Sequence, residues 1–131
     1  MFDRSTQDRL LAVDDSADSA DLVARIAAKC GYDAQAVCDP TSVRALVTSW
    51  KPEILTLDLC MPDADGLDLL SMLEETRFPG QLVIISGQDG WFRKAASRLA
   101  ETRGLKVVDD MQKPVDIAAL RQLLSRLRQS E

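Results

Sequence analysis

Short apolar runs alternate along this chain with longer segments in which apolar residues recur every three or four positions. The runs lie at residues 10–13, 33–38, 53–58, 82–85 and 105–111. Runs of this length fit β-strands, whereas a spacing of three to four is the period of an α-helix. Strands that alternate with helices are typical of βαβ units. The sequence therefore predicts an α/β fold, a doubly wound sheet of five parallel strands with five helices, (βα)5.

Residues with a capping role mark the ends of several expected helices. Ser16 is an acceptable N-cap for the first helix, which should stop at Gly31, and Pro40 suits the first turn of the second. The first four expected helices begin near residue 16, at 41, at 66 or 67 and near 90, the second and fourth end at 50 and 103, and the final helix includes residue 117. The first should bury a stripe of Leu22, Val23, Ile26, Ala27 and Cys30, and the last a stripe of Ile117, Leu120, Leu123, Leu124 and Leu127.

Composition limits the class of protein. The chain has 131 residues, 46% of them hydrophobic, which suits one compact unit. We expect residues 1–8 to form an N-terminal arm and residues 9–131 the domain, with no room for a separate output domain. The net charge is −5, from 16 basic and 21 acidic residues, so no direct nucleic-acid binding is expected.

The same composition bears on location and metal type. No stretch approaches the roughly 20 apolar residues of a membrane span, and no signal peptide is evident, so we expect a cytoplasmic protein without a membrane partner. Three cysteines without C-x-x-C spacing, and no histidine, argue against a disulfide framework or a zinc site.

Polar residues suited to cations and phosphates stand where four of the strands end. Asp14 and Asp15 follow the first strand, Asp58 ends the third, Ser86 follows the fourth, and Lys113 follows the fifth. In an open parallel sheet these ends meet in one crevice. Carboxylate oxygens suit Mg²⁺, whereas a hydroxyl and an ammonium suit phosphate oxygens. The pattern predicts phosphoryl chemistry in this crevice.

This spacing, with Met61-Pro62-Asp63-Ala64-Asp65-Gly66 just after Asp58, resembles the receiver domain of bacterial two-component response regulators. The resemblance covers nearly the whole chain and implies a flavodoxin-like fold. It also implies a phosphoacceptor that assists its own phosphorylation and dephosphorylation but is not an enzyme in the ordinary sense. The implied partners are a sensor histidine kinase or phosphotransfer protein and an output domain or effector protein. Residues 104–108 and the long fourth helix resemble, more weakly, receivers found ahead of EAL-type cyclic-di-GMP phosphodiesterase domains.

The resemblance assigns the acidic residues to phosphoryl transfer and its metal. Asp58 would be the nucleophile that forms an aspartyl phosphate. Mg²⁺ would be held by Asp14, Asp15, Asp58 and the backbone carbonyl of Cys60, whose thiol is not implicated. Alternatively, Asp58 caps the next turn, and the Asp14-Asp15 pair caps the first helix.

Two further residues would contact the phosphate. The Ser86 hydroxyl and the Lys113 ammonium would bind its oxygens, and Gly87 would leave room for it. Family members commonly have a cis bond between this lysine and the following proline, here Pro114. The alternatives are that Ser86 merely ends a strand and that Lys113 is a surface cation.

The chain also departs from the family pattern. Receivers usually carry Tyr or Phe three residues before the lysine, and here that place holds Asp110. We hypothesise that the fifth strand edge reports phosphorylation by charge. The gap between Ser86 and Lys113 is longer than the family norm, which predicts an extended fourth helix. Trp91 and Phe92 stand beside two cations at its start, and either one ring packs in the core or the pair forms a docking patch.

Other functions remain open at this stage. The missing aromatic favours a receiver-like protein-interaction module that is regulated without phosphorylation. A nucleotide-binding enzyme is disfavoured because no G-x-G-x-x-G or G-x-x-x-x-G-K-[ST] loop follows the first strand. Family habit suggests a homodimer through the last two helices, with Arg121, Arg126 and Arg128 available to pair with Asp109 and Asp110, although exposed pairs are individually weak.

Overall fold

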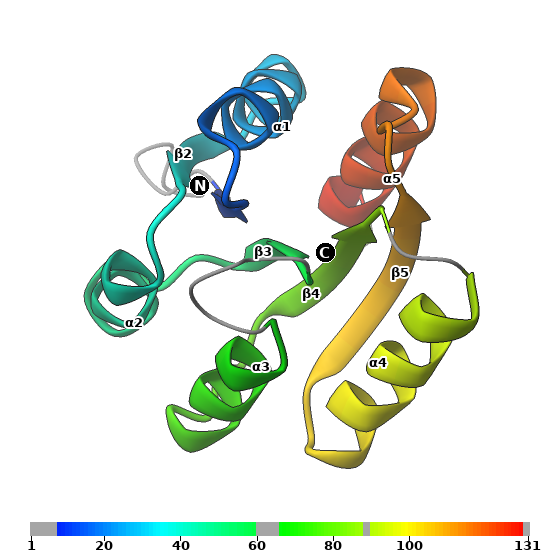
Figure 1. Cartoon of the computed structure of the whole chain (residues 1–131). Coiled ribbons are helices and arrows are strands. Elements are labelled where there is room, and N and C mark those ends of the chain that lie inside the picture. The colour runs from blue at the N-terminus through cyan, green and yellow to red at the C-terminus, as the bar shows by residue number, and fades with distance from the viewer. Residues whose placement is uncertain (1–7, 60–65, 88–89, 130–131) are drawn as a thin grey trace.

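The computed structural model describes residues 8–59, 66–87 and 90–129, and within them five strands alternate with five helices (Figure 1). In chain order these elements are β1 Arg9–Val13, α1 Ala17–Lys29, β2 Asp33–Val37, α2 Pro40–Ser49, β3 Ile54–Asp58, α3 Gly66–Glu75, β4 Gln81–Ser86, α4 Gly90–Thr102, β5 Lys106–Gln112 and α5 Ile117–Gln129. The predicted alternation is confirmed.

All neighbouring strands are parallel, and their order is β2-β1-β3-β4-β5. From β1 the chain first moves outward to β2, and from β3 it moves the other way to β4 and β5. The order therefore reverses between β1 and β3, and a crevice opens beyond the carboxyl ends of strands at such a reversal. The flavodoxin-like fold predicted from the sequence is confirmed.

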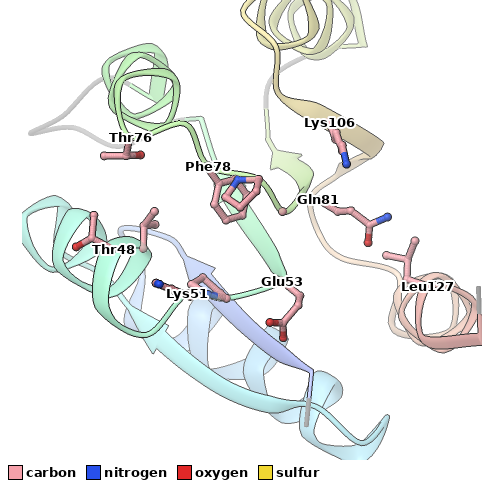
Figure 2. Close-up of a pocket in the computed structure, with 12 residues that line it drawn as sticks. Thr48, Lys51, Glu53, Thr76, Phe78, Gln81, Lys106 and Leu127 are labelled. Atoms are coloured by element: carbon pink, nitrogen blue, oxygen red, sulfur yellow. The ribbon is translucent and has the colours of Figure 1, made fainter. Parts of the chain in front are cut away.

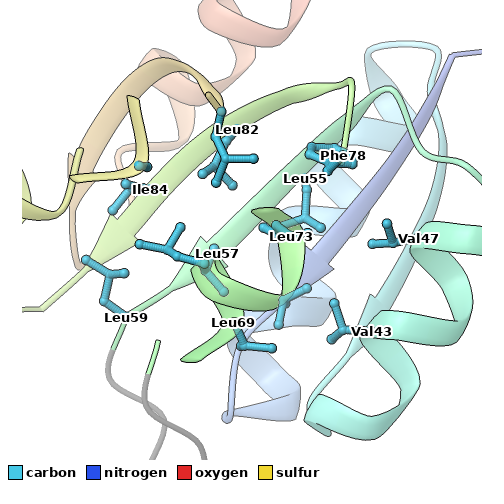
Figure 3. Packing of buried hydrophobic residues seen from close by; sticks show 14 of the residues in the cluster. Val43, Val47, Leu55, Leu57, Leu59, Leu69, Leu73, Phe78, Leu82 and Ile84 are labelled. Carbon is cyan, nitrogen blue, oxygen red and sulfur yellow. The ribbon is translucent and has the colours of Figure 1, made fainter. Parts of the chain in front are cut away.

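Successive strand residues contribute to two cores, one on each face of the sheet. Leu10 and Ala12 of β1 pack in one core with α1 and α5, whereas Leu11 and Val13 pack in the other with α2, α3 and α4. Figure 3 shows part of the second core, with strand leucines against helix side chains. Its labelled residues are Val43, Val47, Leu55, Leu57, Leu59, Leu69, Leu73, Phe78, Leu82 and Ile84. Helices thus cover both faces and leave the strand ends open.

The predicted caps are largely correct. The Ser16 side chain accepts a hydrogen bond from the Ser19 backbone N–H at 3.3 Å, and α1 ends one residue before Cys30. Gly31 follows with φ +96°, where a side chain would be strained. The cap of α2 was missed: Asp39 accepts from the Thr41 backbone N–H at 3.0 Å.

Two residues assigned to buried stripes are exposed. Leu22 is 39% exposed because α1 turns Ala20, Val23 and Ala27 inward, which places Leu22 beside the stripe. Ile117 is 49% exposed because it is the first residue of α5 and no helical turn precedes it. Both predictions of burial were wrong.

The segment between Ser86 and Lys113 contains the expected fourth helix, which ends at Thr102, one residue before the predicted end. With 13 residues, α4 is as long as α1 and α5. In contrast, β5 has seven residues and a shift in register, since Leu82 pairs with Val107 and the next residue, Val83, pairs with Asp109. Val108 is therefore the extra residue of a β-bulge.

Candidate functional site

Three carboxylates gather at the reversal of strand order. Asp58 ends β3 and Asp14 follows β1, and pairing of Val13 with Leu57 brings the two acids side by side. Asp58 is 2% exposed and Asp14 is 5% exposed, whereas Asp15 faces solvent. One oxygen from each of these acids lies within 4.8 Å of the others. The predicted acidic cluster is thus present.

Lys113 reaches the cluster from the end of β5. Its Nζ lies 2.7 Å from Asp14 Oδ2 and 3.2 Å from Asp58 Oδ2. Its backbone N–H donates to the Ser86 carbonyl at 2.9 Å, and the Lys113–Pro114 bond is cis, as expected. The ammonium is therefore a central member of the site and not a surface cation.

The lysine is held in its charged form. Burial by itself lowers the pKa of Lys113. The hydrogen bond to Asp14 and the negative charges of Asp58 and Asp14 act in the opposite direction and prevail, so this pKa lies above its ordinary value. Among the described residues, this one ammonium nevertheless stands beside a cluster of three carboxylates, which gives this part of the crevice an excess of negative charge.

Ser86 completes the described part of the crevice. It is the last residue of β4, fully buried, and its strand neighbour Ile85 pairs with Asp58. A side chain at Gly87 would meet no atom within 4 Å, so the space beside this residue is open. Cys60, with its predicted carbonyl ligand, lies outside the described residues.

The donor set fits Mg²⁺. Neighbouring ligands of an octahedral Mg²⁺ are about 3.0 Å apart, since each bond is about 2.1 Å long. One oxygen from each of Asp14, Asp15 and Asp58 lies within 4.8 Å of the others, so these acids would draw together by up to about 2 Å around one ion. All three are hard oxygen donors, and their surplus negative charge favours a divalent cation.

Sequence reasoning identified Asp110 as unusual but missed its partners. The Asp110 carboxylate contacts Arg93 Nε at 3.3 Å and Lys94 Nζ at 3.2 Å, both from α4. Nearby, Phe92 packs against the core, while Trp91 is 78% exposed. Of the two alternatives for the aromatic pair, the one with a ring in the core is correct.

A separate hollow of about 700 Å³ lies at the opposite end of the sheet (Figure 2). Its lining includes Gln81 and Lys106, the first residues of β4 and β5, as well as Glu53 and Phe78. The carboxylates stand at the carboxyl ends of the strands, so this hollow is not part of their site. No helix in the described residues is long and apolar enough to cross a membrane.

The sheet and its crevice define a flavodoxin-like domain with an acidic, lysine-bearing site. The family model of the response regulator receiver domain matches residues 10–125, and the chain belongs to this family of phosphoacceptor domains.

Among solved structures, a response regulator from Colwellia psychrerythraea is 29% identical with a TM-score of 0.85, covering 96% of this chain and 100% of that one. The receiver domain of NtrX from Brucella abortus is 30% identical with a TM-score of 0.75, covering 93% and 99%.

Curated relatives are longer proteins. The protein-glutamate methylesterase/protein-glutamine glutaminase of Escherichia coli (strain K12) is 35% identical over 109 residues, which are 81% of this chain and 30% of that protein. Regulatory protein VanRc of Enterococcus gallinarum is 31% identical over 83 residues, 63% of this chain and 36% of that protein. The chain thus spans about a third of the length of these relatives.

Proposed function

We propose that Asp58 is the phosphoacceptor of this receiver domain and that Mg²⁺ held by Asp14, Asp15 and Asp58 assists the transfer. The observation that carries the proposal is the buried Asp58 carboxylate, which shares one crevice with two other acids and the ammonium of Lys113. An acid that only capped a turn would not need these neighbours. The backbone carbonyl of Cys60 is proposed as a further ligand from the family resemblance.

The residues divide the work of transfer between them. An Asp58 oxygen forms a bond to phosphorus as the bond to the donor's leaving group breaks, and the leaving group takes up a proton. Lys113 already contacts this carboxylate, so it is placed to follow the charge onto the phosphoryl oxygens. The Ser86 hydroxyl donates to another of these oxygens. Bound Mg²⁺ supplies positive charge to the phosphoryl group.

The domain would assist its own phosphorylation and dephosphorylation without acting as an ordinary enzyme. The proposed donor is a sensor histidine kinase or phosphotransfer protein, and the proposed recipient of the signal is an output domain or effector protein. A homodimer and a cytoplasmic location stay predictions. Arg128, one of the cations expected at the dimer interface, contacts Asp8 of the same chain at 3.6 Å.

Intact mass after incubation with phosphoramidate tests the proposal. The wild type should gain one phosphoryl group only when Mg²⁺ is present, and Asp58→Asn should gain none. Asp33→Asn is a matched control, because Asp33 is an exposed carboxylate at the other end of the sheet, the first residue of β2. A wild type that gains no mass under rapid quenching, or an Asp58→Asn variant that gains as much as the wild type, would contradict the assignment.

A second candidate is an interaction module that works without phosphate. The observation that favours it is Asp110, which stands where receivers usually carry an aromatic ring. In that case a partner would bind the wild type and Asp58→Asn equally, with or without a phosphodonor. Partner binding that rises only after phosphorylation would exclude it.

A further inference from the structure

A cluster of three charged residues, here called the charge latch, joins β5 to α4. It consists of Asp110, Arg93 and Lys94, and each carboxylate oxygen of Asp110 contacts one of the cations. The side chains of Asp110 and Arg93 are only 10% and 13% exposed, whereas that of Lys94 is 67% exposed. The Asp110–Arg93 pair is therefore shielded from solvent, and Lys94 closes the latch from outside.

The bulge in β5 determines which way Asp110 faces. Successive strand side chains alternate between faces, so one extra residue reverses the alternation beyond it. Val108 is that residue, and Met111 beyond it packs with the core under α1 and α5. Asp110 consequently faces α4, in a region where Phe92 and Val107 pack in the other core. A lone carboxylate here would be costly, and Arg93 offsets that cost.

The latch is connected to the acidic crevice through both of its elements. Asp110 lies three residues before Lys113 on the same strand, and Gly90, the first residue of α4, lies four residues after Ser86. A 2.9 Å hydrogen bond from the Lys113 backbone N–H to the Ser86 carbonyl joins the end of β5 to the end of β4. Movement of either residue toward a phosphoryl group would therefore act on β5, on α4 or on both.

We propose that Asp110 is a positioning residue for the phosphorylation response, and that the latch holds α4 in the position that belongs to unmodified Asp58. This inference rests on the proposed function. The latch occurs together with the direct contact between Lys113 and the Asp58 carboxylate, so it belongs to the state in which that carboxylate is unmodified. A phosphoryl group draws Lys113 and Ser86 toward itself. The resulting movement of β5 or α4 weakens the contacts of Asp110 with Arg93 and Lys94. By linkage, opening the latch strengthens phosphoryl binding by the same factor.

Binding of beryllofluoride with Mg²⁺, a stable mimic of the phosphoryl group, measures this linkage. Trp91 lies in the first turn of α4, two residues before Arg93, and its fluorescence reports on the latch once Trp50→Phe removes the other tryptophan. In this background, Asp110→Asn should bind the mimic about 5-fold more tightly or better. Its Trp91 emission without the mimic should already shift toward that of the bound protein.

Matched variants separate a positioning role from a merely structural one. Asp109→Asn makes the same change of charge one residue away, and its amide oxygen still accepts the hydrogen bond from the Asp110 N–H, so its affinity should stay at the wild-type value. Arg93→Gln should bind the mimic more tightly than the wild type. Arg93→Lys keeps a cation, so its affinity for the mimic should return toward the wild-type value. Lys94→Gln alters an exposed side chain that does not threaten folding, and it should show a smaller shift in the same direction.

The outcomes distinguish the two proposals. A wild type that binds the mimic, together with Asp110→Asn and Lys94→Gln variants of unchanged affinity and emission, would overturn the latch and leave the phosphoacceptor assignment intact. Equal gains in Asp109→Asn and Asp110→Asn would also overturn it, because net charge would then explain the effect. A wild type that does not bind the mimic would overturn both.

Discussion

The acidic crevice and the charge latch are both partly buried groups of charged residues near the same end of the sheet, yet their balance of charge is opposite. In the described part of the crevice, three carboxylates cluster beside one ammonium, that of Lys113. In the latch, the single carboxylate of Asp110 faces two cations. The comparison teaches that burial alone does not identify a binding site. A surplus of negative oxygens calls for a metal ion, whereas a carboxylate with both oxygens paired is already satisfied.

Breaking the latch should have the largest effect on stability. Among the described residues, Arg93→Gln leaves the exposed Lys94 as the one cation beside a nearly buried carboxylate, and loss of one partner of a buried pair destabilises by about 3 kcal/mol. Urea unfolding of the wild type and the variant, with and without Mg²⁺, checks this value. Mg²⁺ should not restore the loss, since the latch has no surplus acid for it. Arg25→Gln, which breaks an exposed pair with Asp21, is the control and should change stability by less than about 1 kcal/mol.

Removing the cation of the crevice should give a smaller loss that Mg²⁺ reverses. Lys113→Gln leaves Asp14 and Asp58 without their ammonium, but the side chain of Lys113 is 25% exposed, so solvent reduces the loss to about 2 kcal/mol. A metal bound only by the folded state then stabilises it by mass action. Unfolding curves at increasing Mg²⁺ should bring the variant toward the wild type. A loss that Mg²⁺ leaves unchanged would contradict the view of the crevice as a metal site.

Much of this comparison could be anticipated from the sequence. The order of strands and helices follows from local periodicity, and the crevice follows from it because parallel strand ends converge at one edge. The acids and Lys113 were therefore placed together correctly. The latch could not be predicted in the same way, because the bulge at Val108 depends on how β5 pairs with β4, which no local pattern specifies. The exposure of Ile117 likewise depends on where its helix begins on the sheet.

The two buried acids should contribute more to metal binding than the exposed one. Asp14→Asn should weaken Mg²⁺ binding about tenfold, equivalent to about 1.4 kcal/mol, because its carboxylate is fixed beside Asp58 before the metal binds. Asp15→Asn should weaken it less, since an exposed side chain is less fixed. Calorimetric titration with Mg²⁺ gives both values, with Asp18→Asn as the control from the first turn of α1. Equal losses of Mg²⁺ affinity in Asp14→Asn and Asp15→Asn would show that holding a carboxylate in place before the metal binds has no influence on affinity.

The smallest effect on the free energy of unfolding should appear at alkaline pH, and it should differ between the acidic crevice and the charge latch. The pKa of Lys113 lies above its ordinary value, so its ion pairs stabilise the fold fully at pH values below that ordinary pKa, and the stabilisation is lost as pH rises through the higher pKa of the folded state. The difference in unfolding free energy between the wild type and Lys113→Gln should therefore narrow from pH 8 to pH 11 in Mg²⁺-free buffer. The difference between the wild type and Arg93→Gln should not narrow, because a guanidinium stays charged throughout this range. If the difference in unfolding free energy narrowed equally for Lys113→Gln and Arg93→Gln, alkaline pH would be weakening the fold as a whole. The loss could then not be assigned to deprotonation of Lys113.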